Sequence, residues 1–240
     1  MSTNYAPIGI LKTCFPEKFG VPRQSMMVTE ARGIIKLNSD PAYRAAVDQL
    51  ERFSHIWIIF VFHKIGERAW RPMIKSPRIE ASKVGVFASR SPHRPNPIGM
   101  SAVKLERIDL EAQGGIEIHV SGVDILDGTP VLDIKPYLPY ADIIPEANSG
   151  WADREIERYS VEFSSESLAA IESSNHAGLK ELLLQMIALD PRPTAQRDSL
   201  PIDAEKTKGM NFGFRVLDLE VEWEFRGGGI FVLDIVPTKR

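Results

Sequence analysis

The chain has 240 residues, of which 43% are hydrophobic and 25% are charged, with a formal net charge of −3. These values fit one globular domain with an appendage, or two small domains, and they exclude disordered, fibrous and collagen-like proteins. Cys14 is the only cysteine, which excludes a disulfide framework and a thiolate zinc cluster and favours a reducing compartment.

The first part of the chain is typical of an all-β unit, because short runs rich in Val and Ile alternate with turn residues. One helix is predicted after Asp40, which can cap it, with Pro41 at its first position and Tyr43, Val47 and Leu50 on one face. The strands are predicted at residues 7–13, 55–63, 84–89, 101–108, 116–121 and 130–135. We therefore expect a compact barrel or sandwich.

Residues 55–63 are apolar on both faces, which is typical of a strand with neighbours on both sides, so this strand is predicted to be central. Gln113-Gly114-Gly115 predicts a hairpin turn that leads into the alternating residues 116–121.

After Tyr140 the composition changes, and prolines and small polar residues predict a loop with a domain boundary near residue 150. Residues 1–150 would form a mainly β, barrel-like domain, and residues 151–240 a smaller α+β domain. In the second domain we predict a strand at 160–163, helices at 168–171 and 179–189, and closing strands at 212–225 and 230–236. Asp190-Pro191-Arg192-Pro193 should stop the second helix, and Arg226-Gly227-Gly228-Gly229 should join the two closing strands.

Several classes of protein are excluded by what the sequence lacks. The longest apolar run, residues 56–62, is too short to cross a bilayer, and no basic patch precedes a hydrophobic stretch at the start. No G-x-G-x-x-G or Walker loop follows a strand, which argues against a Rossmann-type enzyme. The five histidines lack metal-ligand spacing. We expect a cytoplasmic protein without a membrane segment or a metal.

Positive charge is concentrated in one stretch, although the whole chain is slightly acidic. Between residues 64 and 107 there are ten basic residues against Glu67, Glu80 and Glu106, a local charge of +7 that leaves −10 for the remainder. Such asymmetry favours a face that contacts phosphates, and ordinary solvated surface charges are the alternative. The basic residues are Lys64, Arg68, Arg71, Lys75, Arg78, Lys83, Arg90, Arg94, Lys104 and Arg107.

Residues 89–100 form a polar segment stiffened by three prolines, which fix φ and remove backbone donors. A stiff loop can hold Arg90, His93, Arg94 and Asn96 for a ligand with little further loss of entropy on binding. The alternative is a well-ordered connection between two strands.

Residues 126–140 predict a turn that leads into a strand ended by a proline. In an extended strand, Asp133 and Lys135 share one face, and Leu132 and Ile134 share the other. The pair is either a functional carboxylate and cation or a common surface ion pair.

These two segments read S-R-S-P-H-R-P-N-P-I-G-M-S and D-G-T-P-V-L-D-I-K-P-Y-L-P-Y. Together they closely resemble the TrmO family of tRNA (adenine(37)-N6)-methyltransferases, also called TsaA-like or YaeB-like proteins. The resemblance extends to residues 16–24, 53–63, 70–72 and 190–193, and so covers nearly the whole chain.

The resemblance implies a β-barrel that binds S-adenosylmethionine outside the usual methyltransferase architectures. It also implies a homodimer with an appended C-terminal domain, which would bind tRNA or have another accessory role. The implied reaction is N6-methylation of threonylcarbamoyladenosine beside the anticodon of threonine tRNA. The family's cofactor contacts match Pro16, Glu17, Lys18, His63, Lys64, Arg90, Met100, Leu126, Asp127, Gly128 and Thr129.

The N6 lone pair of this substrate is delocalised into the purine and the carbamoyl group, so the nitrogen must lose its proton as it attacks the methyl. A carboxylate could accept that proton, and a fixed cation could stabilise the charge that develops on the carbamoyl oxygen. Asp133 and Lys135 are the predicted pair. Asp127 and Tyr137 are alternatives, and positioning of the substrate alone is a third possibility.

Arginines could pair with tRNA phosphates or with the threonyl carboxylate, and unstacked bases could rest on aromatic side chains. Met100 and Phe19 could form apolar walls for the cofactor. The predicted RNA-binding residues are Trp70, Arg71, Arg94, Tyr137 and Arg192. Two rival functions remain at this point, a non-catalytic RNA-binding barrel and a methyltransferase of a small metabolite.

Overall fold

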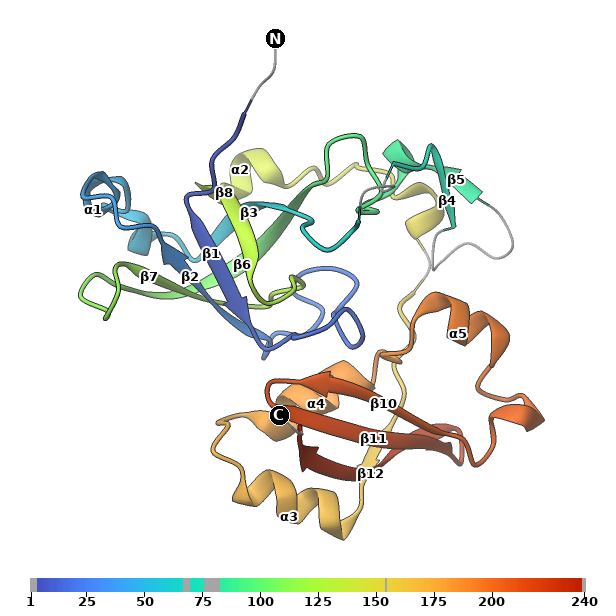
Figure 1. Cartoon of the computed structure of the whole chain (residues 1–240). Coiled ribbons are helices and arrows are strands. Elements are labelled where there is room, and N and C mark those ends of the chain that lie inside the picture. The colour runs from blue at the N-terminus through green and yellow to red at the C-terminus, as the bar shows by residue number, and fades with distance from the viewer. Residues whose placement is uncertain (1–3, 67–69, 76–82, 154, 239–240) are drawn as a thin grey trace. The chain divides into compact units, whose positions relative to one another are not determined.

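The computed structural model describes residues 4–66, 70–75, 83–153 and 155–238 (Figure 1). By internal contacts the chain divides into two compact units, and each unit combines segments that are distant in sequence. The first unit comprises Met1–Lys12, Gly33–Ser121 and Gly128–Glu155, and the second comprises Thr13–Arg32, Gly122–Asp127 and Ile156–Arg240. Of the basic stretch, Arg68 and Arg78, with Glu67 and Glu80, lie outside the described residues.

Six strands close into a barrel in the order β1-β2-β7-β6-β3-β8. This closure confirms the predicted mainly β fold with a barrel, and it joins strands that are far apart in sequence. The strands are β1 Gly9–Thr13, β2 Arg32–Leu37, β3 His55–Val61, β6 Ile98–Asp109, β7 Glu117–Ser121 and β8 Thr129–Pro136.

Strand β3 pairs antiparallel with β6 on one side and with β8 on the other, as expected for a central strand. Its alternate residues Ile56, Ile58 and Phe60 are buried in the barrel core, and those between them are only half-buried. The strand ends at Val61, two residues earlier than predicted. The Phe62 N–H still donates to the carbonyl of Pro97, the next residue of the β3–β6 register, but Pro97 has no N–H to donate in return, so the ladder stops there.

Gly99 is required by the packing of the barrel interior. It lies directly opposite Phe60 in the β3–β6 register, and a Cβ atom at this position would overlap the Phe60 ring. The missing side chain therefore leaves room for the aromatic ring that fills this part of the core.

The predicted helix after Asp40 is shorter than expected. Oδ1 of Asp40 accepts a hydrogen bond from the Ala42 N–H at 2.9 Å, as a cap should. Helix α1, Ala42–Ala46, then stops because Gln49 adopts a left-handed φ of 61°, and the chain continues in the 3-10 turn Leu50–Arg52.

The predicted strand at residues 84–89 is only partly correct. Strands β4, Met73–Lys75, and β5, Lys83–Gly85, form a small hairpin sheet, and the 3-10 turn Val86–Ala88 follows. The turn forms because the Ser89 N–H and hydroxyl both donate to the carbonyl of Val86, at 3.1 and 2.8 Å. The short helix α2, Pro139–Asp142, and the 3-10 turn Gly150–Ala152 lie in the predicted linker.

The second unit contains a four-stranded sheet in the order β10-β11-β12-β9, with β9 parallel to β12 and helix α3 packed against β12. It confirms the predicted α+β class. Its strands are β9 Val161–Phe163, β10 Asn211–Val216, β11 Leu219–Arg226 and β12 Gly229–Pro237, and its helices are α3 Ser165–Ser173, α4 Leu179–Ile187 and α5 Thr194–Ser199, followed by the 3-10 turn Glu205–Thr207.

The predicted single strand at residues 212–225 is wrong, because it is a hairpin of β10 and β11. The turn is made by Leu217 and Asp218, and Leu217 adopts a left-handed φ of 56° without help from a glycine. Within the described residues, no helix is long and apolar enough to span a membrane.

Candidate active site

The predicted catalytic pair lies on the outer face of the barrel. Ile59 of β3 is directly opposite Met100 on β6 and Asp133 on β8, so these three side chains share one face. Met100 is exposed, and Ile59 is half-buried on the face opposite the core. The sheet therefore brings together a predicted catalytic carboxylate and a predicted cofactor contact, 33 residues apart in sequence.

Asp133 and Lys135 form an ion pair with 2.8 Å between Oδ2 and Nζ. Oδ1 of Asp133 also accepts a hydrogen bond from the Ile134 N–H at 2.9 Å. The two side chains are 47% and 61% exposed, so the pair contributes little to stability. Both charged groups remain accessible to a bound molecule.

An aromatic cluster lies beside this pair. Trp57 is directly opposite Lys135 in the β3–β8 register, and its ring centroid lies 5.6 Å from that of Tyr137. The Trp57 indole N–H donates to Oδ2 of Asp142 at 3.1 Å, which fixes the ring. Tyr137, an alternative catalytic residue and a predicted RNA contact, therefore lies at one end of the row that contains Asp133 and Lys135.

The other predicted cofactor contacts of the first unit are His63, Lys64, Arg90, Gly128 and Thr129. The Thr129 hydroxyl and Nδ1 of His63 lie 3.3 Å apart, within hydrogen-bonding distance. Gly128 adopts a φ of 75°, which favours glycine, and no atom lies within 4 Å of where its Cβ would be. Lys64 and Arg90 are exposed.

The remaining predicted cofactor contacts belong to the second unit. Pro16 and Lys18 are exposed, and the Glu17 carboxylate binds Arg215 at 2.7 Å, a contact that raises the pKa of the Arg215 guanidinium. Oδ1 of Asp127 accepts from the Thr13 N–H at 3.0 Å, and the Asp127 N–H donates to Phe15. Asp127 and its half-buried neighbour Leu126 thus help to hold residues 13–15 in place.

The proline-rich segment is ordered by Arg94, whose guanidinium donates to the carbonyls of Val86 and Ser89 at 3.1 and 2.7 Å. Its last residues, Ile98 to Met100, belong to strand β6 and not to the predicted loop. The carbonyl of His93 accepts a hydrogen bond from the N–H of Arg71, which ties the two predicted RNA-binding regions together.

Two exposed aromatic side chains, Trp70 and Phe87, form what we call the aromatic platform. They are 50% and 75% exposed, and their ring centroids lie 6.4 Å apart with a 30° angle between the planes. The Arg94 guanidinium lies 5.8 Å from the Phe87 ring. Trp70 was predicted from the sequence as an RNA contact, but Phe87 was not. The only feature that could have indicated Phe87 is its position, as an aromatic residue, within the basic stretch.

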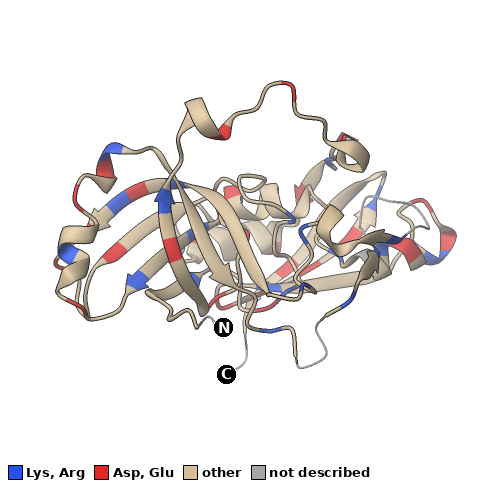
Figure 2. Ribbon diagram, turned by 90° about the horizontal axis from the view of Figure 1, so that it is seen from above, with Lys and Arg blue, Asp and Glu red and all other residues tan. Residues whose placement is uncertain are grey.

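Charge on the barrel strands is interleaved, as the alternating blue and red segments of Figure 2 show. Two cations of the basic stretch, Lys104 and Arg107, bind the nearby carboxylates of Glu106 and Asp109. The exposed cations Lys64, Arg71, Lys75, Lys83 and Arg90 precede β6 in the chain.

Arg192 of the second unit is a structural residue as well as a predicted RNA contact. Its side chain is 2% exposed, and Nε and Nη2 each donate to the Asp190 carboxylate at 2.8 Å. Nη1 donates to the carbonyl of Leu200 at 2.8 Å. The guanidinium is thus committed to the fold, and an effect on RNA binding would come from positioning the turn that it holds.

The closed barrel and the α+β unit define a mainly β chain of two compact parts. The family description for the tRNA-methyltransferase O N-terminal domain matches residues 10–143, and that for the TrmO C-terminal domain matches residues 156–238. The chain therefore belongs to the TrmO family, and the membership predicted from the motifs is confirmed.

Individual relatives match over almost the whole chain. The tRNA (adenine(37)-N6)-methyltransferase of Escherichia coli is 36% identical, over 98% of this chain and 99% of its own. A Pseudomonas aeruginosa protein named as a candidate S-adenosylmethionine-dependent methyltransferase, RcsF, is 38% identical over 98% of both chains. The crystal structure of TrmO from Pseudomonas aeruginosa superimposes with a TM-score of 0.76, at 36% identity, over 98% of this chain and 99% of that one.

Proposed function

We propose that this protein uses S-adenosylmethionine to methylate N6 of adenosine 37 in a tRNA, and that this adenosine carries a threonylcarbamoyl group in threonine tRNA. The end-to-end similarity to the Escherichia coli tRNA (adenine(37)-N6)-methyltransferase carries this proposal. We further propose a cytoplasmic homodimer in which residues 1–150 perform methyl transfer and residues 151–240 support tRNA binding.

The residues around the candidate site fit S-adenosylmethionine, which would supply an electrophilic methyl group. Exposed Met100 offers apolar surface, and exposed Arg90 offers a cation for the carboxylate of the amino-acid part. Gly128, with open space at its Cβ position, allows a ligand to approach the backbone closely.

Asp133 would act as the general base. Its half-exposed carboxylate accepts one backbone hydrogen bond and contacts Lys135, and its other lone pairs could accept a further N–H. The N6 proton would pass to this carboxylate as the nitrogen forms its bond to the methyl carbon, while the methyl–sulfur bond of S-adenosylmethionine would break and its sulfur would leave as a neutral thioether. Lys135 would stabilise the negative charge that develops on the carbamoyl oxygen.

The aromatic platform would hold unstacked bases of the anticodon loop, since single-stranded RNA bases commonly stack on aromatic side chains. The exposed cations Arg71 and Lys75 lie close to Trp70 in the chain and could contact the flanking phosphates. Arg94 would act on RNA through the loop that it orders and through its position over Phe87.

The deciding experiment is transfer of labelled methyl from S-adenosylmethionine to threonine tRNA, with and without the threonylcarbamoyl group, followed by mass spectrometry of the nucleosides. Label on N6 of the modified adenosine alone supports both the reaction and the substrate. Equal label on both tRNAs retains the methyltransferase but overturns the threonylcarbamoyl requirement. Absence of label on either tRNA, with S-adenosylmethionine binding confirmed, overturns the proposed reaction.

A further inference from the structure

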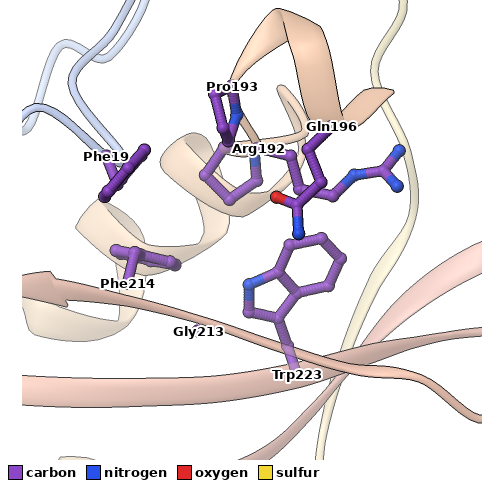
Figure 3. A pocket seen from close by; sticks show the side chains of 8 residues that line it. Phe19, Arg192, Pro193, Gln196, Gly213, Phe214 and Trp223 are labelled. Atoms are coloured by element: carbon purple, nitrogen blue, oxygen red, sulfur yellow. The ribbon is translucent and has the colours of Figure 1, made fainter. Parts of the chain in front are cut away.

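The second unit contains a pocket of about 350 Å³ (Figure 3), and of its lining residues only Phe19 and Arg192 were predicted from the sequence to contact cofactor or RNA. Phe19 and Phe214 stand on one side of it, and Gln196 of α5 and Trp223 of β11 stand on the other. Pro191 and Pro193 of the turn after α4 complete the wall. Small-molecule sites span about 300 to 1,000 Å³, so this pocket suits a single flat ring system.

The pocket contains a buried hydrogen-bond donor without a partner. Trp223 is 1% exposed, and its indole Nε1 has no hydrogen-bond acceptor among the described residues. In Figure 3 the nitrogen edge of this ring faces the side of the pocket where Phe214 stands. Buried polar groups are nearly always paired, so an unpaired indole N–H at a pocket wall indicates that a ligand supplies the acceptor.

Gln196 provides a second polar group at the same place. Its side chain extends from α5 toward the Trp223 ring (Figure 3), and its carboxamide makes no hydrogen bond that the structure describes. A carboxamide offers both donors and an acceptor. Together with the indole N–H, it matches the mixed donor and acceptor edge of a nucleobase.

The walls of the pocket are held rigidly. The Asp190–Arg192 ion pair fixes the turn that carries both prolines, and the Arg192 guanidinium stacks on Phe212 and Phe225, 5.0 and 4.5 Å from their centroids. Phe212 stacks in turn on Trp223, with 4.9 Å between ring centroids. A preformed site of this kind loses little entropy when it binds a ligand.

Phe19 is held close to the pocket by its neighbour in the chain. Gly20 has a φ of 81°, and a Cβ atom there would lie 2.8 Å from the Phe214 ring, so only glycine allows this approach. The ammonium of Lys18 lies 5.4 Å from the centroid of the Phe19 ring. The edge of the pocket therefore carries a cation suited to a phosphate next to a bound base.

We propose that this pocket receives one unstacked base of the tRNA substrate, an inference that rests on the proposed function. The base would lie against the aromatic walls, accept a hydrogen bond from the Trp223 indole and complete its pairing with Gln196. A phosphate of the same strand would contact Lys18. The occupant is assigned to RNA, and not to a free nucleoside, because the exposed Lys18 ammonium, 5.4 Å from the centroid of the Phe19 ring, offers a cation for a backbone phosphate.

The test measures binding of a fluorescent anticodon stem-loop to the full-length protein without S-adenosylmethionine. Trp223→Phe removes the N–H and keeps a single aromatic ring, Gln196→Ala removes the carboxamide, and Gln113→Ala in the exposed β6–β7 hairpin is the matched control. Both pocket variants should weaken binding by about threefold to tenfold, as expected for one lost hydrogen bond. Because Trp223 is buried, the smaller ring of Trp223→Phe leaves a cavity and should lower the unfolding temperature, so binding is measured well below that temperature, where circular dichroism shows that both variants are folded.

A series of stem-loops, each lacking one base, then identifies the occupant. One RNA of the series should bind the wild-type protein as weakly as the intact RNA binds Trp223→Phe, and the two changes together should cause no further loss. Additive losses at every position, or normal binding by both pocket variants, overturn the proposal.

Three further outcomes separate RNA from a free nucleoside as the occupant, and the pocket from the proposed reaction. Adenosine, guanosine, cytidine or uridine that binds in a Trp223-dependent manner, while RNA binding is unaffected, overturns the assignment to RNA. Normal methylation with pocket-independent RNA binding overturns the pocket alone. Pocket-dependent RNA binding without methylation supports the pocket and overturns the proposed reaction.

Discussion

On strand β8 the ammonium nitrogen of Lys135 lies 2.8 Å from Oδ2 of Asp133. If this carboxylate accepts the N6 proton, Asp133→Asn removes a general base, and such a group contributes about 10²- to 10⁴-fold to a rate. We expect kcat to fall at least about 100-fold in steady-state methylation assays. Binding of S-adenosylmethionine and the unfolding temperature should not change, because a half-exposed ion pair adds little stability.

The matched control for that variant is Asp109→Asn on β6. Asp109 also pairs with a cation two residues away along a strand, Arg107, at 3.4 Å. Its methylation rate should equal that of the wild type. An Asp133→Asn enzyme with normal kcat would exclude this carboxylate as the base and leave Asp127, Tyr137 or positioning of the substrate as the explanation.

The aromatic platform gives a prediction on RNA affinity. Stacking of a base on an aromatic side chain contributes about 1 to 3 kcal/mol, so Trp70→Ala and Phe87→Ala should each weaken tRNA binding roughly fivefold or more. Both side chains are largely exposed, so the free energy of unfolding should stay the same. Tyr5→Ala, which removes another exposed aromatic ring, is the control, and an equal loss in that variant would contradict a specific role for the platform.

The buried pair of Asp190 and Arg192 gives a prediction on stability. Removal of one partner from a buried ion pair typically costs about 3 to 5 kcal/mol, so Arg192→Ala should strongly lower the denaturant midpoint of the second unit. Arg192→Lys should restore little, because lysine cannot donate to both carboxylate oxygens while it stacks on Phe212 and Phe225. Arg226→Ala, which breaks the exposed pair with Glu224, should cost less than about 1 kcal/mol.

Cys14 is predicted to be unreactive in the folded protein. Burial raises the pKa of its thiol from 9.0 to about 12, so the thiolate that reacts with alkylating reagents is scarce at pH 8. Iodoacetamide should label the native protein far more slowly than the protein in denaturant. Because the folded pKa is the higher one, the thiol's contribution to stability is present below pH 9 and is lost as the pH rises from about 9 toward 12. Rapid labelling of the native protein would contradict the burial.

Gly99→Ala tests the packing of the barrel core. The added methyl would overlap the Phe60 ring, and overpacking of this kind typically costs about 1 to 3 kcal/mol. Phe60→Leu in the same chain should recover part of that loss, and a double-mutant cycle in chemical denaturation measures the coupling. Strictly additive effects of the two substitutions would mean that the methyl is accommodated elsewhere.

Local patterns predicted much of the first part of the chain. The apolar run at residues 55–63 and the alternation at residues 130–135 correspond to β3 and β8. These strands could be predicted because the pattern of apolar and polar residues that marks a strand lies within a few consecutive residues. The hairpin at Leu217 and Asp218 was missed, since Leu217 is not a typical turn former, Asp218 alone is a weak turn signal, and both flanks favour strands. Barrel closure was not specified in order or register, because these depend on pairings between distant segments.

The candidate site divides in the same way. Asp133 and Lys135 were found because both belong to one strand, whereas their alignment with Met100 depends on the pairing of β3 with β6 and β8. Arg192 was predicted from the sequence to contact RNA. In the structure its guanidinium donates to the carboxylate of Asp190, whose left-handed φ of 52° turns the chain at this point. The pocket around Trp223 was not predicted, since its walls come from three separated segments.

The second unit is built from chain segments that are distant in sequence, and this has a consequence for synthesis on the ribosome. Residues 13–32 are made early, yet their partners come late: the Cys14 carbonyl accepts from the Leu217 N–H at 2.7 Å, and Arg23 donates to the Leu189 carbonyl at 3.2 Å. At a translation rate of about 5 to 20 residues per second, those partners are synthesised on the order of ten seconds or more after residues 13–32. During that interval Phe15 and Val28, both buried in the finished protein, have no core to enter and are available to chaperones.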